Sequence, residues 1–164
     1  MRTLVRSVGR ASIGGEPLPS CFKAFEASKI IVRRSEVSMF AGAPGVGKST
    51  LALALALKTN VPTLYISADT NAHTMAMRLA SMISGKNQTD VEHKLNTDVG
   101  WTKAVLQKGS HIIWCFESSP TLQDISEEVQ AFEELWGCPP TMIILDNLMD
   151  VATDGGEEFA SMRA

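Results

Sequence analysis

The sequence predicts an α/β fold in which a mainly parallel sheet carries helices on both faces. Two observations support this prediction: short apolar segments alternate with longer helical segments, and a glycine-rich loop separates the first such strand from the next helix. This order implies right-handed strand–helix–strand crossovers, which place helices over a parallel sheet. With 164 residues, 45% hydrophobic and 20% charged, the chain has the size and composition of one globular domain.

The strands and helices are assigned in chain order from length, apolar pattern and flanking turn formers. Strands are predicted near residues 37–41, 63–67, 111–116 and 141–146. Helices are predicted between them, near residues 48–59, 71–84, 90–107 and 121–136. The first helix contains LALALAL, and Leu and Ala are both strong helix formers. Because this helix is apolar all round, we expect it to be buried on all sides.

Charge is distributed unevenly along the chain. Residues 1–34 hold seven Lys or Arg against two acids, whereas the remainder holds eight against sixteen. We therefore predict a basic N-terminal arm or linker over residues 1–34 and a globular domain over residues 35–164. The acidic remainder lacks the charge pattern of a nucleic-acid-binding surface.

Three widely spaced cysteines and the absence of a secretory signal favour a reducing, cytoplasmic location. The sequence predicts no membrane association, because no apolar run approaches the ~20 residues that span a bilayer.

The segment AGAPGVGKST, residues 41–50, contains the phosphate-binding pattern GxxxxGK[ST] between a predicted strand and a predicted helix. Its glycines would let backbone N–H groups and the helix N-terminus surround a phosphate. We predict that Lys48 binds the β and γ phosphates of ATP and that Ser49 offers its hydroxyl to Mg²⁺. A plain glycine turn before a helix is the alternative. The predicted nucleotide-binding residues are Gly42, Ala43, Pro44, Gly45, Val46, Gly47, Lys48, Ser49 and Thr50.

A second group for the metal is expected at the end of another strand. The segment TMIILD ends in Asp146, a carboxylate that could hold Mg²⁺ through a water molecule. The alternative is an ordinary turn-forming aspartate after a buried strand.

Asp69 has two possible roles. It follows the apolar segment TLYIS together with Thr70 and Asn71, and all three are preferred helix N-cap residues. At the carboxyl end of a parallel strand, however, an acid can also face the ligand and orient or deprotonate the attacking water.

Four segments together are similar to the ATPase core of DnaB-type replicative helicases, within the RecA-like ATPases. They span about residues 36–152 and read FAGAPGVGKSTLALALAL, PTLYISADTNAHTMAMRLAS, HIIWCFESSPTLQDISEEV and MIILDNLMDV. The family's strand ending in a Ser-x-Glu-Met-like turn matches residues 67–70, and its Met-Arg-Leu matches residues 77–79. The resemblance implies that Asp69 is the catalytic acid and Asp146 the Walker B aspartate.

The resemblance implies a motor that couples ATP hydrolysis to movement along single-stranded DNA in replication, with Mg²⁺ and a hexameric ring of identical subunits. The alternatives are a RecA- or RadA-like recombination or repair ATPase, a small-molecule P-loop kinase, and an inactive nucleotide-binding fragment. Asp69 stands where the family has Glu, which withdraws the carboxylate by about 1.5 Å. Because the family's core continues after the Walker B strand, we expect this chain to represent the N-terminal portion of such a core.

Overall fold

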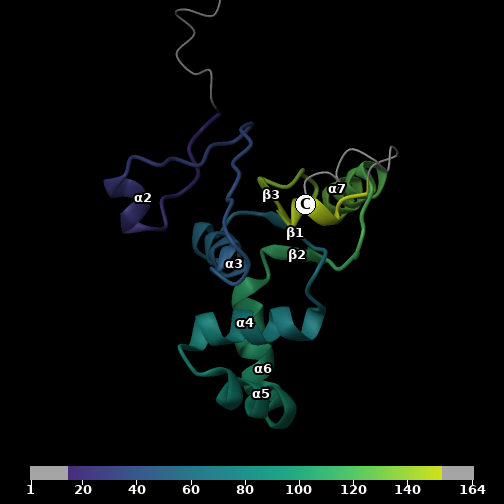
Figure 1. The fold of residues 1–164 in the computed structure, drawn as a ribbon. Helices are drawn as coiled ribbons and strands as arrows, with labels where there is room; N and C mark the ends of the chain where they lie inside the picture. The colour runs from purple at the N-terminus through teal and green to yellow at the C-terminus, as the bar shows by residue number, and fades with distance from the viewer. Residues whose placement is uncertain (1–14, 153–164) are drawn as a thin grey trace, which may run out of the picture. The chain divides into compact units, whose positions relative to one another are not determined.

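The computed structural model describes residues 15–152, and Figure 1 shows their fold. The chain forms two units, one ending at Lys48 and the other beginning at Ser49. The N-terminal unit contains helix α2 (Lys23–Ala27) and an antiparallel bridge between Pro17 and Arg33. Among residues 15–152, the sheet and the helices after α2 belong to the second unit, apart from Lys48 at the start of α3.

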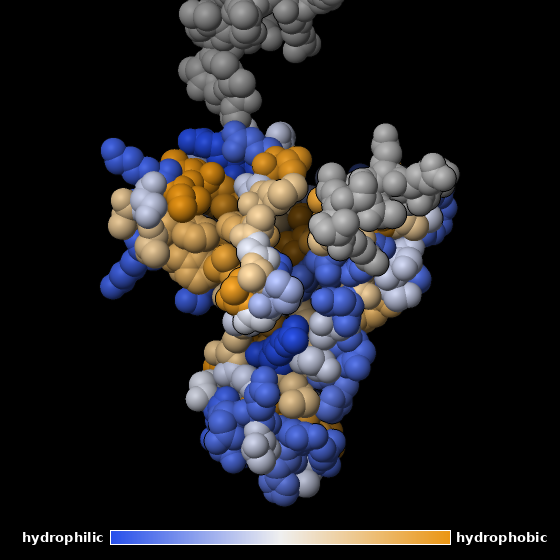
Figure 2. Space-filling model, in the orientation of Figure 1, coloured by the Kyte–Doolittle hydropathy of each residue, from blue (hydrophilic) through white to orange (hydrophobic). Residues whose placement is uncertain are grey.

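The predicted strand at residues 37–41, which lies in the N-terminal unit, does not form. The segment takes part in no strand, and the side chains of Val37 and Met39 are 98% and 73% exposed. An apolar segment becomes a strand only where a neighbouring strand supplies hydrogen bonds and a core buries one face. Figure 2 shows hydrophobic residues gathered over the α2 region, and this unit exposes Ile30, Ile31, Val37, Met39 and Phe40.

Three parallel strands form the sheet, in the order β2 (Ile112–Cys115), β1 (Thr63–Ser67) and β3 (Met142–Asp146). The predicted segments 63–67, 111–116 and 141–146 agree with these strands to within one residue at each end. Every residue of the central strand β1 is buried, as expected for a parallel strand with neighbours on both sides. Tyr65 pairs with Trp114 of β2 and with Ile144 of β3.

The two faces of the sheet are covered by different helices. On one face, Leu64 and Ile66 pack with Phe132 of α7 (Leu122–Trp136). On the other, α3 (Lys48–Thr59) approaches the sheet: Ser49 Oγ bonds Asp146 of β3, and His111 Nε2 lies 3.1 Å from the carbonyl oxygen of Ala56. Figure 1 likewise shows α3 and α7 on opposite sides of the sheet. The predicted two-sided α/β arrangement is confirmed.

Helix α3 has the predicted bounds but is not buried on all sides. Leu53, Leu55 and Ala56 are buried, whereas Leu51, Ala54 and other residues of LALALAL are only partly buried. The expectation of all-round burial is therefore wrong for the residues described: apolar composition allows burial on every side, but packing partners decide which sides are covered.

A second apolar cluster joins α4 (Ala72–Ser84), α5 (Gln88–Thr97) and α6 (Val99–Leu106). Ala80, Val91 and Val105 form its buried centre. The prediction of a single helix over residues 90–107 is wrong. The helix is interrupted at Asp98, whose backbone has non-helical angles of φ −125° and ψ 85°. Asp98 Oδ1 accepts a hydrogen bond from Trp101 N at 2.9 Å, so this residue ends one helix and caps the next.

The chain continues through two short 3₁₀ helices, η1 (Gln107–Gly109) before β2 and η2 (Leu148–Asp150) after β3. Across residues 15–152, no helix is long and apolar enough to cross a membrane.

Candidate nucleotide and metal site

The glycine-rich loop ends the N-terminal unit. Gly45 and Gly47 have φ angles of 79° and 94°, in the left-handed region that residues with a Cβ adopt only under strain. Lys48 Nζ donates hydrogen bonds to the carbonyl oxygens of Gly42 and Ala43, at 2.8 and 3.0 Å. The side chain of Lys48 therefore folds back over the loop. Residues 42–47 are exposed, so their backbone groups are accessible to an anion.

The second unit brings Ser49 and Asp146 together, although 97 residues separate them in the sequence. Ser49, near the start of α3, donates a hydrogen bond from Oγ to Asp146 Oδ1 at 3.0 Å. Asp146 is the last residue of β3 and is 7% exposed. Hydroxyl and carboxylate oxygens are ligands that Mg²⁺ prefers, so this pair fits the predicted metal-binding role.

Tyr65 completes this cluster and was not among the residues predicted from the sequence. Its hydroxyl donates a hydrogen bond to Asp146 Oδ2 at 2.8 Å, and its side chain is fully buried. Burial, and next the negative charge of Asp146, hold the pKa of Tyr65 far above the ordinary tyrosine value. The phenol therefore stays protonated at neutral pH and acts as the donor.

A sequence signal for this contact was present but indirect. A tyrosine in the middle of a buried strand needs a polar partner for its hydroxyl. Alternation along β1 places Tyr65 on the same face as Ser67, and Ser67 pairs with Asp146 in the register of the sheet. The pairing of β1 with β3, which no local pattern specifies, was needed to identify the partner.

Asp69 lies in the turn that follows β1. Ser67 Oγ closes this turn by donating to the carbonyl oxygen of Thr70 at 2.9 Å, and Thr70 Oγ1 donates to Asp69 Oδ1 at 2.8 Å. The N-cap of α4 is Asn71, whose side chain accepts a hydrogen bond from Thr74 N. Asp69 is exposed and does not cap the helix.

Asp69 follows β1 and Asp146 ends β3, and these two paired strands end at the same edge of the sheet. The pairing ends with Ser67 opposite Asp146, and Ala68 N donates to the carbonyl oxygen of Asp146 at 2.8 Å. Because β1 and β3 are parallel, the turn containing Asp69 and the end of β3 lie at the same carboxyl edge.

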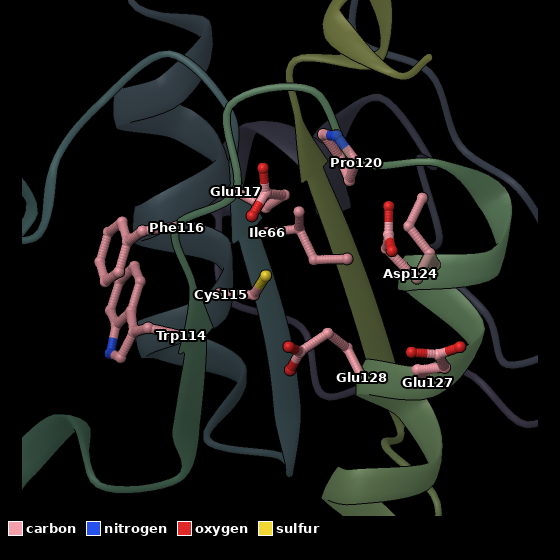
Figure 3. Close-up of a pocket in the computed structure, with 10 residues that line it drawn as sticks. Ile66, Trp114, Cys115, Phe116, Glu117, Pro120, Asp124, Glu127 and Glu128 are labelled. Atoms are coloured by element: carbon pink, nitrogen blue, oxygen red, sulfur yellow. The ribbon is translucent and has the colours of Figure 1, made fainter. Parts of the chain in front are cut away.

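A separate pocket of about 350 Å³ lies between β2 and α7. Figure 3 shows Cys115 of β2 and Glu128 of α7 directed into it, with Glu117 in the loop just after β2. Neither Asp69 nor Asp146 lines this pocket. Burial, and next the charge of Glu128, raise the pKa of Cys115, so its thiol remains protonated and is a poor nucleophile.

Three comparisons place the chain among known proteins. A family model described as AAA domain matches residues 28–163. The Gene 65 protein of Mycobacterium phage L5 is 33% identical over 146 residues, which is 87% of this chain and 54% of that protein. The Gene 65 protein of Mycobacterium phage D29 is 32% identical over 123 residues, covering 70% of this chain and 50% of that protein. The chain therefore spans about half the length of these relatives.

Among solved structures, the chain is similar to one described as an ATPase domain, with a TM-score of 0.60 and 13% sequence identity. The match covers 70% of this chain and 44% of that structure, and it confirms the predicted RecA-like fold. The family match, the loop geometry and the parallel sheet agree, and the chain belongs to the AAA domain family of P-loop ATPases.

Proposed function

We propose that this chain binds ATP with Mg²⁺, hydrolyses ATP, and supplies the ATPase part of a DnaB-like motor that moves along single-stranded DNA. The observation that carries the proposal is the hydrogen bond between Ser49 and Asp146. It joins the start of the helix after the phosphate-binding loop to the end of the strand predicted to hold the metal. The RecA-like fold and the AAA domain family support the ATPase step, and the four-segment resemblance supports the motor.

Each residue has a defined part in this proposal. Lys48 neutralises the phosphates, exchanging its bonds to the loop carbonyls for bonds to phosphate oxygens. Residues 42–50 surround the phosphates with backbone N–H groups. Ser49 and Asp146 would hold Mg²⁺, Asp146 through a water molecule, and the ion would neutralise charge on the phosphate oxygens. Homo-oligomerisation, as a hexameric ring, belongs to the motor proposal.

Asp69 is proposed to orient or deprotonate the attacking water. The structure leaves its carboxylate available for this role, because Asn71 caps α4 and Asp69 accepts a bond only from the Thr70 hydroxyl among the interactions of the described residues. Its shorter side chain, compared with Glu, places the carboxylate about 1.5 Å farther back, and Asp69→Glu restores the longer side chain.

The Asp69 role predicts opposite results for two substitutions. Asp69→Glu retains the acid and is expected to keep activity. Asp69→Asn removes the base and is expected to lower the rate by at least about 100-fold, the lower end of general acid–base contributions. Steady-state phosphate release measures both variants. Equal activity of Asp69→Asn and the unchanged chain would rule out Asp69 as the base.

The motor proposal is tested with the protein that carries the chain. We expect phosphate release from ATP to rise when single-stranded DNA is added and to be lost in Lys48→Ala. Turnover independent of DNA would contradict a motor, and transfer of the γ-phosphate to an acceptor other than water would indicate a kinase. A strand-displacement assay separates a helicase from a recombination or repair ATPase, which binds DNA and hydrolyses ATP without unwinding.

A further inference from the structure

The carboxylate of Asp146 is held by two side chains from different elements. Ser49 Oγ of α3 donates to Oδ1 at 3.0 Å, and Tyr65 of β1 donates to Oδ2 at 2.8 Å. Asp146 therefore has one oxygen directed toward the start of the phosphate-binding helix and the other fixed from within the sheet. A carboxylate with a single partner could rotate about its side-chain bonds, whereas two donors from different elements define one orientation.

The position of Tyr65 is itself fixed by the sheet. Tyr65 and Trp114 are opposite each other in the register of β1 and β2, and their ring centroids are 4.9 Å apart. Trp114 in turn stacks on Phe116 with centroids 6.0 Å apart. Because β1 pairs with β2 and β3 on either side, the backbone of Tyr65 is fixed whichever aromatic ring stands at position 114. Its hydroxyl reaches Asp146, two residues beyond its own β3 partner, Ile144.

We propose that Tyr65 is a positioning residue for the metal, because its hydroxyl holds the Asp146 carboxylate in the orientation that leaves Oδ1 facing Ser49. This inference rests on the proposed function, since it assumes that Ser49 and Asp146 hold Mg²⁺. The Ser49 hydroxyl can bind a metal through an oxygen lone pair while its proton is still donated to Asp146. The Tyr65 bond does not involve the metal-binding oxygen of Ser49, so it can remain and keep Asp146 in place.

The test compares metal binding by matched variants of the chain. The probe is Mn²⁺ in the presence of ADP, followed by electron paramagnetic resonance, because Mn²⁺ accepts the same oxygen ligands as Mg²⁺. Tyr65→Phe keeps the ring and removes only the hydroxyl. We expect it to weaken Mn²⁺ binding about tenfold, which corresponds to roughly 1.4 kcal/mol. The affinity for ADP without metal should change by less than about twofold, which is much smaller than the loss of Mn²⁺ affinity.

Trp114→Phe is the matched control, because it alters the packing of the Tyr65 ring but leaves its hydroxyl and Asp146 intact. We expect this variant to bind Mn²⁺ as the unchanged chain does. If Trp114→Phe weakens Mn²⁺ binding as much as Tyr65→Phe, the effect is one of packing and the inference is wrong. Unchanged Mn²⁺ binding in Tyr65→Phe would also overturn it.

Asp146→Asn separates failure of this inference from failure of the proposed function. If Asp146→Asn abolishes Mn²⁺ binding while Tyr65→Phe leaves it unchanged, Asp146 holds the metal and only the role of Tyr65 is refuted. If Asp146→Asn leaves Mn²⁺ binding intact, the metal assignment itself fails, and the inference fails with it.

A second measurement needs no substitution and remains decisive if Tyr65→Phe does not fold. Tyr65 is the single tyrosine of the 164-residue chain, so tyrosine labelled with ¹³C at the ring carbon bearing the hydroxyl gives one resonance. Titration with Mg²⁺ in the presence of ADP should shift this resonance. The change in chemical shift should reach its limit at the same Mg²⁺ concentration as metal binding measured separately. A resonance that does not move while the metal binds would overturn the inference.

Discussion

Tyr65 illustrates how a buried polar side chain in the central strand depends on a single partner. Its side chain is fully buried, and its hydroxyl is 2.8 Å from Asp146 Oδ2. A buried hydroxyl without a partner costs about 1–3 kcal/mol, so the bond serves Tyr65 as well as Asp146. Asp69, which follows in the turn after the same strand, is exposed. The two residues therefore respond differently to substitution.

Ionisation of Tyr65 provides a test of this burial. Its pKa is raised by burial and next by Asp146, whereas the unfolded chain ionises near the ordinary tyrosine value of about 10. The folded state thus keeps its full stability below about pH 10 and loses stability as the pH rises above it, because only the unfolded state releases the proton there.

Near-ultraviolet absorbance of tyrosinate measures this directly, since the chain contains one tyrosine. We expect the urea-unfolded chain to titrate at about pH 10 and the folded chain to show tyrosinate only as it unfolds at higher pH. A folded chain that titrates together with the unfolded one would show that Tyr65 is accessible to solvent.

At the scale of elements, caps set the boundaries of the helices around the site. Asn71 caps α4, Asn87 caps α5 and Asp98 caps α6. Thr121 and Asp124 form a capping box at the start of α7. These caps are local signals. Asp98, the capping residue between α5 and α6, was therefore visible in the sequence although the prediction missed the boundary there. The helical periodicity of the flanking apolar residues continued across it and favoured one long helix.

The cap of α4 separates the structural and catalytic roles near Asp69. Asn71→Ala removes the acceptor for Thr74 N and is expected to lower the free energy of unfolding by about 1 kcal/mol. Asp69→Ala is the matched control and should change it by less than about 0.5 kcal/mol, as for an exposed residue. Urea unfolding followed by circular dichroism measures both. Equal losses in the two variants would mean that Asp69 shares the capping role.

At the scale of the whole molecule, the sheet and α7 of the second unit supply the core that supports the cluster of Ser49, Tyr65 and Asp146. Leu64, Ile66 and Phe132 form its buried centre, on the face of β1 opposite Tyr65. The site therefore depends on packing on both faces of one central strand: α7 supports the strand from one side, and the polar cluster of Ser49, Tyr65 and Asp146 occupies the other.

Phe132→Ala tests this dependence. Phe132 is 1% exposed, whereas Leu135 on the same helix is 69% exposed. We expect Phe132→Ala to lower the free energy of unfolding by about 3–5 kcal/mol, and Leu135→Ala to change it by less than about 0.5 kcal/mol. Chemical denaturation measures both variants. A similar small effect of both would indicate that the packing of α7 contributes little to stability.

The sequence by itself determined the features that depend on neighbouring residues. Hydrophobic periodicity, helix propensity and glycine content are local properties, so each can be recognised within a short segment. They identified the loop of residues 41–50, the strands near 63–67, 111–116 and 141–146, and the helix at 48–59. The parallel α/β class followed from their order.

Only the tertiary structure decided which distant residues meet. Strand pairing brings Tyr65 to Asp146 across 81 positions, and helix packing brings Ser49 to Asp146 across 97. The same reason explains the errors: residues 37–41 have the pattern of a strand without a paired neighbour, and α3 is apolar all round without being covered all round. Pairing and coverage depend on segments far apart in the chain, so a local pattern specifies what a segment can form and not what it contacts.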